Sequence, residues 1–248
     1  MGQIAYNAMT GETAEAFSVS DAVWLGICAA PLGTWLMPRT GWPAVPKTSI
    51  RGLRFFAHAP GFAGQLPHPE SYAHTRLKID VVKAARAMGF RAELEVWGTD
   101  GNGAEWIADA LVFADNGAPV AFEIQLSSQH LDGFLARGER YQRSGVKCCW
   151  IMSERPVALR LTKALSYKNI QYYRETGEFL CDCEEIVPFA VDLAGKDTYP
   201  DVLPPVRFSR GRHIKRMPLS EAINGMLRGY PNWRLPDWHW RAPEVSVD

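Results

Sequence analysis

The order of secondary structure between residues 69 and 152 constrains the fold more than any other feature of the sequence. Residues 69–89 place apolar side chains at helical spacing, and Gly89 is suited to end a helix. Turn-separated runs then predict three strands, a second helix and a fourth strand, at 90–97, 105–114, 118–127, 127–145 and 146–152. A strand, helix, strand sequence favours a parallel right-handed crossover. We therefore predict an α/β fold with a mixed sheet and an αβββαβ core.

The composition is typical of a soluble globular protein, with 47% hydrophobic and 22% charged residues in a chain of 248. The longest run without charge, residues 22–38, is short and is interrupted by Gly26, Pro31 and Gly33. We therefore predict neither a membrane span nor a signal peptide. Five cysteines without a CxxC spacing suit a reducing compartment, so we expect a cytoplasmic protein.

Three regions differ in character along the chain. Residues 1–60 mix short apolar runs with Gly, Pro and Thr, which is typical of a small turn-rich module. Residues 61–153 contain the αβββαβ order, and we expect residues 154–248 to be helical or irregular, with a basic and aromatic tail. The net charge is zero, but residues 51–91 carry seven Lys or Arg against two acids, and residues 207–216 carry five against none. This distribution is compatible with a polyanionic partner or with an ordinary solvated surface.

Two predicted strands carry a carboxylate where the surrounding residues are apolar. Asp109 lies within "EWIADALVF" and Glu123 within "VAFEIQ", and Glu123 shares a strand face with Gln125. Buried carboxylates are costly unless they are paired, hydrogen-bonded or bound to a metal. If they converge across the hairpin, the two acids could hold a hard cation such as Mg²⁺, which lowers the pKa of bound water and screens a phosphodiester. Alternatively, they lie on a wet sheet face or pair with Arg91 or Lys147.

Six short runs together resemble a known family: "RFFAH", "PESYAHTRLK", "ELEVW", "IADALV", "FEIQLSS" and "RGERYQRSGVKCCWIM". They are similar to the competence protein CoiA family, whose central domain is a divergent member of the PD-(D/E)XK nuclease superfamily. The resemblance covers residues 50–152 and implies a restriction-endonuclease-like fold. It also implies an endo- or exonuclease that hydrolyses DNA with Mg²⁺ or Mn²⁺ during DNA uptake, recombination or processing.

The resemblance assigns roles to a small set of residues. Asp109 matches the motif Asp and Glu123 the motif Glu, which are expected metal ligands, and Glu70 matches an acidic residue that supplies a further ligand. Gln125 occupies the position of the usual Lys, so it can orient water but brings no positive charge. We expect Lys78, on the same helix face as Glu70, to supply that charge and, with Gln125, to position water or phosphate.

Basic residues on two helices and the tail are candidates for contacts with DNA. The second predicted helix carries a stripe of arginines, which can track a phosphate backbone or can be a solvated helix face. The C-terminal tail interleaves cations with aromatics, which can contact phosphates and stack on unpaired bases, or can pack as core. The predicted DNA-binding residues are His74, Arg137, Arg140, Arg143, Arg210, Arg212 and Lys215.

The N-terminal module departs from the ribbon-type zinc unit of CoiA relatives, because only Cys28 is available where paired cysteines are expected. We therefore predict no structural zinc, with Cys28 and His58 as packing or hydrogen-bonding residues. The expected partners are DNA, single-stranded or branched, and recombination proteins, with no membrane. Two alternatives stay open: a DNA-binding module that has lost cleavage, favoured by Gln125, and a protein-interaction component of recombination or defence machinery.

Overall fold

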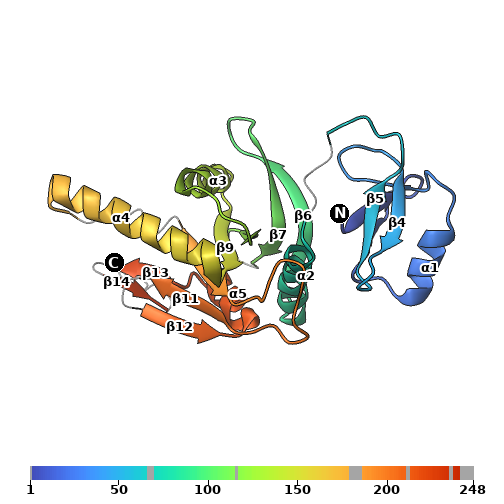
Figure 1. The fold of residues 1–248 in the computed structure, drawn as a ribbon. Helices are drawn as coiled ribbons and strands as arrows, with labels where there is room; N and C mark the ends of the chain where they lie inside the picture. The colour runs from blue at the N-terminus through green and yellow to red at the C-terminus, as the bar shows by residue number, and fades with distance from the viewer. Residues whose placement is uncertain are drawn as a thin grey trace. The chain divides into compact units, whose positions relative to one another are not determined.

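The computed structural model describes residues 2–65, 70–114, 117–178, 186–210, 213–234 and 237–240. The chain divides into two compact units, Met1–Glu70 and Ser71–Asp248, whose elements are traced in Figure 1. Each unit has a hydrophobic core of its own. No helix among the described residues is both long and apolar enough to cross a membrane.

The N-terminal unit is built from two small antiparallel sheets and one helix. Its elements are β1 (Ile4–Asn7), β2 (Thr13–Glu15), α1 (Asp21–Ala29), β3 (Trp35–Leu36), β4 (Ala44–Thr48) and β5 (Arg54–His58). One sheet has the order β2-β1-β3, and the other is a hairpin of β4 and β5. Ser20 begins the helix, because its hydroxyl accepts a hydrogen bond from the Val23 amide.

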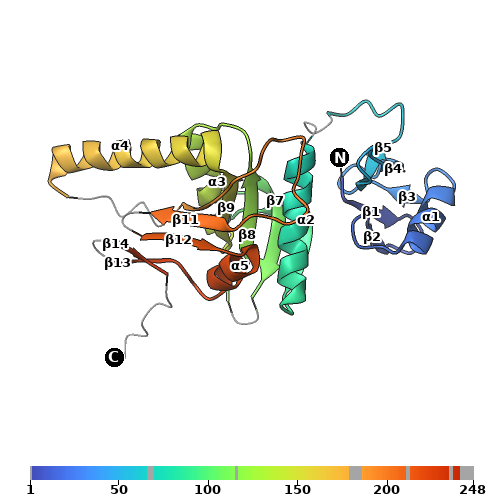
Figure 2. The same cartoon turned by 60° about the horizontal axis from the view of Figure 1, so that its bottom comes forward.

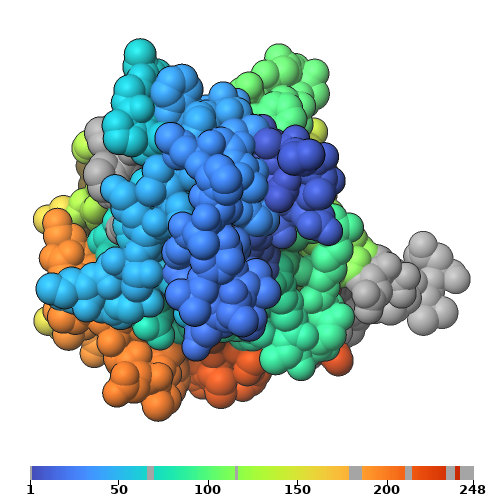
Figure 3. Space-filling model, turned by 90° about the vertical axis from the view of Figure 1, so that its right-hand side faces the viewer, coloured from blue at the N-terminus to red at the C-terminus, as the bar shows by residue number. Residues whose placement is uncertain are grey.

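The core of this unit forms around Phe56, which is fully buried. The ring of Trp24 meets it edge-on with centroids 5.5 Å apart, which holds helix α1 against the hairpin. Figure 3 shows the surface of the unit, in blue, as a continuous layer of packed atoms. Cys28 is exposed, and His58 Nε2 lies 3.1 Å from the Thr40 hydroxyl. The absence of structural zinc stays a prediction.

The second unit confirms the predicted order of helix, three strands, helix and strand. Its first elements are α2 (Tyr72–Ala87), β6 (Arg91–Thr99), β7 (Glu105–Phe113), β8 (Val120–Gln125), α3 (Leu131–Arg143) and β9 (Lys147–Ser153). Strands β6, β7 and β8 pair antiparallel, whereas β9 joins β8 in parallel after the α3 crossover. Gly89 follows helix α2 with a left-handed φ of 88°, as expected of a residue that ends a helix. The mixed sheet fits a restriction-endonuclease-like fold.

Residues after Ser153 extend the same sheet, a contribution that the sequence analysis did not predict. They form η1 (Glu154–Ala158), α4 (Leu159–Thr176), β10 (Val187–Val191), β11 (Val206–Arg210), β12 (His213–Met217), α5 (Leu219–Leu227), β13 (Asn232–Arg234) and β14 (Asp237–His239). The seven-stranded order is β12-β11-β10-β9-β8-β7-β6, with β10 parallel to β9. The aromatic tail packs on this sheet, since Trp238 is buried with its ring centroid 5.9 Å from that of Phe208.

Helices cover both faces of the sheet (Figure 2). Helix α2 packs against β6, β7, β8 and α5, while α3 and α4 pack together on the opposite face. The core on the α3 and α4 side contains Phe134, Trp150 and Leu161. Strands β8, β9 and β10 run parallel, so their carboxyl ends lie on the same side of the sheet. Ligands of α/β proteins usually bind beyond the carboxyl ends of the strands.

Candidate metal-binding active site

The start of helix α2 supplies two residues of the candidate site. Ser71 caps the helix, because its hydroxyl accepts a hydrogen bond of 3.3 Å from the His74 amide. Glu70 directly precedes this cap, so Glu70 and His74 lie at the same end of α2. One potential ligand atom from each of Glu70, His74 and Asp109 lies within 4.8 Å of the other two, and all three side chains are partly exposed. We call these three residues the candidate metal site.

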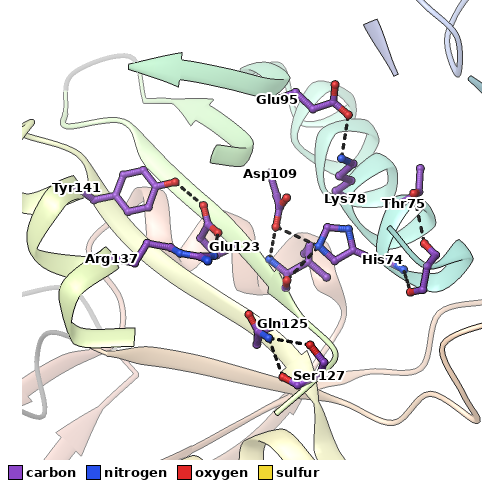
Figure 4. A network of polar contacts seen from close by, with 12 residues as sticks. His74, Thr75, Lys78, Glu95, Asp109, Glu123, Gln125, Ser127, Arg137 and Tyr141 are labelled. Atoms are coloured by element: carbon purple, nitrogen blue, oxygen red, sulfur yellow. Dashed lines mark hydrogen bonds and ion pairs between the residues drawn. The ribbon is translucent and has the colours of Figure 1, made fainter. Parts of the chain in front are cut away.

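Asp109 of strand β7 contacts both strand β8 and helix α2 (Figure 4). Its Oδ2 accepts a hydrogen bond of 2.8 Å from the Ile124 amide of β8 and lies 3.3 Å from His74 Nε2. The same His74 nitrogen lies 3.1 Å from the Ile124 carbonyl oxygen. Strand β8 and helix α2 thus fix the orientation of the Asp109 carboxylate and of the His74 ring.

The alternation of strand β7 is broken between Ala108 and Leu111, next to Asp109, whose carboxylate meets His74 of helix α2. Ala108 and Leu111 are three residues apart, yet both pack in the cluster around Tyr141, which a regular period of two does not allow. Opposite Asp109 on strand β6, Glu95 has a φ of 55°, in the left-handed region that costs a non-glycine residue energy. Irregularities of this kind are over-represented beside active sites.

Glu123, the second predicted metal ligand of the strands, points to the opposite face of the sheet, towards helix α3. Its Oε2 forms an ion pair of 2.6 Å with Arg137 Nη1, and its Oε1 accepts a hydrogen bond from the Tyr141 hydroxyl. Burial, and after it the nearby Asp109 carboxylate, raises the pKa of Glu123 to about 7, while Arg137 and Tyr141 act in the opposite sense. The structure therefore places Glu123 near Asp109 but outside the candidate metal site.

Helix α3 satisfies both carboxylate oxygens of Glu123. Tyr141 is fully buried, and burial raises the pKa of its phenol far above the usual range, so the hydroxyl stays a hydrogen-bond donor. The Arg137 guanidinium lies 5.3 Å from the ring centroid of Trp150, the residue that pairs with Glu123 between strands β8 and β9. Arg137 is thus held by a carboxylate and an aromatic ring together.

Gln125 and Lys78, the residues predicted to position water or phosphate, are both engaged by other groups. The Gln125 amide donates to the Ser127 carbonyl oxygen at 2.7 Å and to the Ser127 hydroxyl at 3.2 Å. Lys78 is fully buried on α2, and its ammonium lies 2.9 Å from Glu95 Oε1. A catalytic role for either residue stays a prediction.

The arginine stripe of α3 contacts different parts of the sheet. Besides the Arg137 pair, Arg140 donates to the Glu105 carbonyl oxygen at 3.2 Å. Arg143 Nε forms an ion pair of 2.8 Å with Asp100, whose side chain is fully buried in the turn between β6 and β7. The stripe therefore anchors α3 to the sheet, and its role in binding DNA stays a prediction.

Of the predicted DNA contacts of the tail, Arg210 is the last residue of strand β11 and Lys215 lies on strand β12. Lys215 of β12 forms an ion pair of 2.6 Å with Glu221 of α5, and its ammonium lies 5.3 Å from the Trp240 ring centroid. Arg212 lies outside the described residues, as does the side chain of Arg210. Lys215 thus links the sheet, α5 and the aromatic tail, while its contact with DNA stays a prediction.

His74 was predicted as a DNA contact, and the structure places it among the potential metal ligands. The signal in the sequence was its four-residue distance from Glu70, but that spacing alone could not show that Asp109 turns towards the same end of α2. Two carboxylates and one imidazole fit a divalent ion that accepts both oxygen and nitrogen ligands. The residues present are therefore compatible with the expected metal.

The segment that carries this site is similar to a known protein family. Residues 70–178 match the family described as competence protein CoiA, nuclease-like domain. No curated protein and no solved structure matches the chain. The matched segment begins at Glu70 and contains the whole candidate metal site as well as Glu123. Residues 70–178 of this chain are therefore similar to the nuclease-like domain of the competence protein CoiA family.

Proposed function

We propose that the segment from Glu70 to residue 178 is a DNA nuclease that hydrolyses phosphodiester bonds with the help of a divalent metal ion. The observation that carries the proposal is the convergence of Glu70, His74 and Asp109, whose ligand atoms lie within 4.8 Å of one another. These side chains are partly exposed, so a substrate phosphate can reach them. The match to a nuclease-like domain supports the same assignment.

Glu70, His74 and Asp109 would hold the ion, Mg²⁺ or Mn²⁺. Such an ion polarises a phosphate and lowers the pKa of a water ligand. Because Mg²⁺ prefers oxygen ligands throughout, the imidazole nitrogen of His74 favours Mn²⁺ over Mg²⁺ in this site. The hydrogen bond from the Ile124 amide leaves one Asp109 oxygen to face the ion and keeps its carboxylate in place.

Residues around the candidate metal site have separate proposed roles. Glu123 lies on the α3 face with its carboxylate held by Arg137 and Tyr141, so we assign it no contact with the ion or with the attacking water. Its proposed role is to hold helix α3 against the sheet near Asp109. Gln125 would release its hydrogen bond to Ser127 and use the same amide group to orient water. Lys78 would contribute positive charge from α2.

We also propose that the substrate is single-stranded or branched DNA, processed in the cytoplasm during uptake or recombination. The description of the matching family as a competence protein supports this process. The proposed phosphate contacts are the α3 arginines and the cations of the tail. Recombination proteins are the proposed partners.

Cleavage assays with a matched control test the proposed nuclease. Labelled single-stranded, duplex and branched DNA would be incubated with wild type, Asp109→Asn and Glu93→Gln in Mn²⁺, Mg²⁺ or EDTA. Glu93 is exposed on strand β6 and pairs with Arg91, so its substitution changes a sheet carboxylate outside the site. Wild type and Glu93→Gln should cleave in metal only, and Asp109→Asn should be slower by about 100-fold or more. Equal cleavage by a folded Asp109→Asn protein would contradict the proposal.

A DNA-binding module without cleavage is the second candidate. It is favoured by one observation, the full engagement of Glu123 by Arg137 and Tyr141 on the face away from the candidate metal site. This candidate predicts binding of DNA by wild type and Asp109→Asn alike, in EDTA as in Mn²⁺, with no product. Absence of binding at low salt would instead favour a protein-interaction role.

A further inference from the structure

A cavity of about 270 Å³ lies on the α3 and α4 face of the sheet, apart from the candidate metal site. Its floor is apolar and consists of Ala158, Pro188 and Ala190, which are all buried. Its walls are polar and come from η1, from the first turn of α4 and from strand β11. They include Glu154, Arg155, Thr162, Arg207 and Ser209.

The cationic groups of this cavity are incompletely compensated. Arg207 forms an ion pair of 3.0 Å with Glu154, but its Nε is buried and has no hydrogen-bond partner within the described part of the chain. Arg155 is exposed and forms no ion pair with any described residue. A buried guanidinium N–H without an acceptor is costly, so a site of this kind calls for an added acceptor.

A third arginine lies next to the cavity. Arg216 of β12 is paired directly with Arg207 of β11, and residues paired in this way project from the same face of a sheet. Like charges in directly opposed positions destabilise a sheet, and the single carboxylate of Glu154 offsets only one of them. An anion between the arginines would relieve the repulsion and supply the missing acceptor.

We propose that this cavity is a binding site for a phosphoryl group, with Arg155 and Arg207 as its cationic ligands. Arginine binds phosphate oxygens through two parallel N–H groups, and the Thr162 and Ser209 hydroxyls add neutral hydrogen-bonding capacity. The volume of about 270 Å³ is slightly below the range of small-ligand sites, which are about 300–1,000 Å³. It therefore suits a phosphate with an attached sugar, either at the end of a nucleic-acid strand or in a small phosphorylated molecule.

The register of the sheet relates this cavity to Gln125, the residue that we propose to orient water. Gln125 pairs with Met152, Met152 with Ala190, and Ala190 with Arg207, so these residues form one row across four neighbouring strands. Three strand spacings place Arg207 about 14 Å from Gln125 on the same face. A nucleic-acid strand bound at Gln125 could thus place a terminal phosphate in the cavity. Only the proposal that the ligand is the end of a nucleic-acid strand rests on the proposed function.

Binding measured in EDTA tests the phosphoryl site separately from cleavage. A labelled single-stranded oligonucleotide would carry a phosphate at its 5′ end, at its 3′ end or at neither end, and affinity would be read by fluorescence anisotropy. Inorganic phosphate and ribose 5-phosphate would be tested by thermal shift at constant ionic strength. The variants are Arg155→Gln and Arg207→Gln, with Arg91→Gln on the opposite edge strand as the matched control.

A terminal phosphate should strengthen oligonucleotide binding by about tenfold in wild type and Arg91→Gln, and not in either cavity variant. Stabilisation by the free phosphates alone, lost in Arg155→Gln, would support the site with a small molecule as its ligand. Should Arg207→Gln fail to fold because Glu154 loses its partner, the Arg155→Gln variant, which changes an exposed residue, still tests the proposed site. Wild type and Arg155→Gln responding identically to every phosphate would overturn the proposal.

Discussion

Arg137 of helix α3 forms an ion pair of 2.6 Å with Glu123 of strand β8, on the face of the sheet away from His74. Glu123 is almost fully buried, so removal of the guanidinium would leave a carboxylate in the protein interior with the Tyr141 hydroxyl as its one remaining partner among the described residues. The pair therefore couples the packing of α3 to the protonation state of Glu123, a carboxylate that lies near Asp109.

Substitution of Arg137 by Met should destabilise the fold. At pH 8 we expect the free energy of unfolding to fall by about 3 kcal/mol, because a buried carboxylate loses its counter-charge. Urea denaturation measures this change. Arg140→Met is the matched control: Arg140 contacts backbone carbonyl oxygens and no buried carboxylate, so its loss should cost less than about 1 kcal/mol. Equal losses in the two variants would show that the Glu123 pair has no special role.

The raised pKa of Glu123 predicts a pH dependence of stability. An acid whose pKa is higher in the folded than in the unfolded protein stabilises the fold below its unfolded pKa, and this contribution is lost as pH rises through the folded value of about 7. Between pH 5 and pH 8, wild type should therefore lose about 2 kcal/mol of unfolding free energy relative to Glu123→Gln. Parallel pH profiles of the two proteins would exclude a raised pKa at this residue.

Metal binding should depend on the three ligands of the candidate metal site. We expect Mn²⁺ to raise the melting temperature of wild type more than Mg²⁺ at equal concentration, because the site contains an imidazole. His74→Asn should reduce the Mn²⁺ effect, and Asp109→Asn should abolish it. Glu93→Gln should respond as wild type does, since Glu93 pairs with Arg91 outside the site. A Mn²⁺ shift that survives in Asp109→Asn would place the ion elsewhere.

Glu95 should contribute more to stability than its exposed neighbour Glu93. Glu95→Gln removes a negative charge 2.9 Å from the Lys78 ammonium, which is fully buried, and we expect a loss of about 2–4 kcal/mol. Glu93→Gln breaks an exposed pair with Arg91 and should cost less than about 1 kcal/mol. Denaturant titration of both variants decides the matter, and a Glu95→Gln protein as stable as Glu93→Gln would mean that Lys78 is compensated elsewhere.

Local pattern predicted the αβββαβ core because each element carries its own periodicity and its own end signal, such as Gly89 after helix α2. Strands β11 and β12 were missed because their basic residues hide the alternation, and because their partner β10 is distant in the sequence. Pairing between distant segments is set by tertiary packing rather than by local propensity.

The candidate site was predictable in its residues but not in its geometry. Strand periodicity places Glu123 and Gln125 on one face, but it could not show that the alternation of strand β7 breaks next to Asp109 or that Asp109 meets His74. The spacing of the arginines also could not show that Arg137 forms an ion pair with Glu123. Each of these features depends on contacts between separate elements, which a single sequence does not specify.

Helix α2 contacts neighbouring strands at intervals of one helical turn: His74 meets Asp109 of β7, and Lys78 meets Glu95 of β6. Four residues advance a helix by about 6 Å, close to the strand spacing of about 4.8 Å. One inserted or deleted residue between His74 and Lys78 would rotate the two side chains apart by about 100° and break one of the contacts. Distant relatives that keep this arrangement should therefore align without gaps between these two positions, whatever the lengths of their strand-connecting turns.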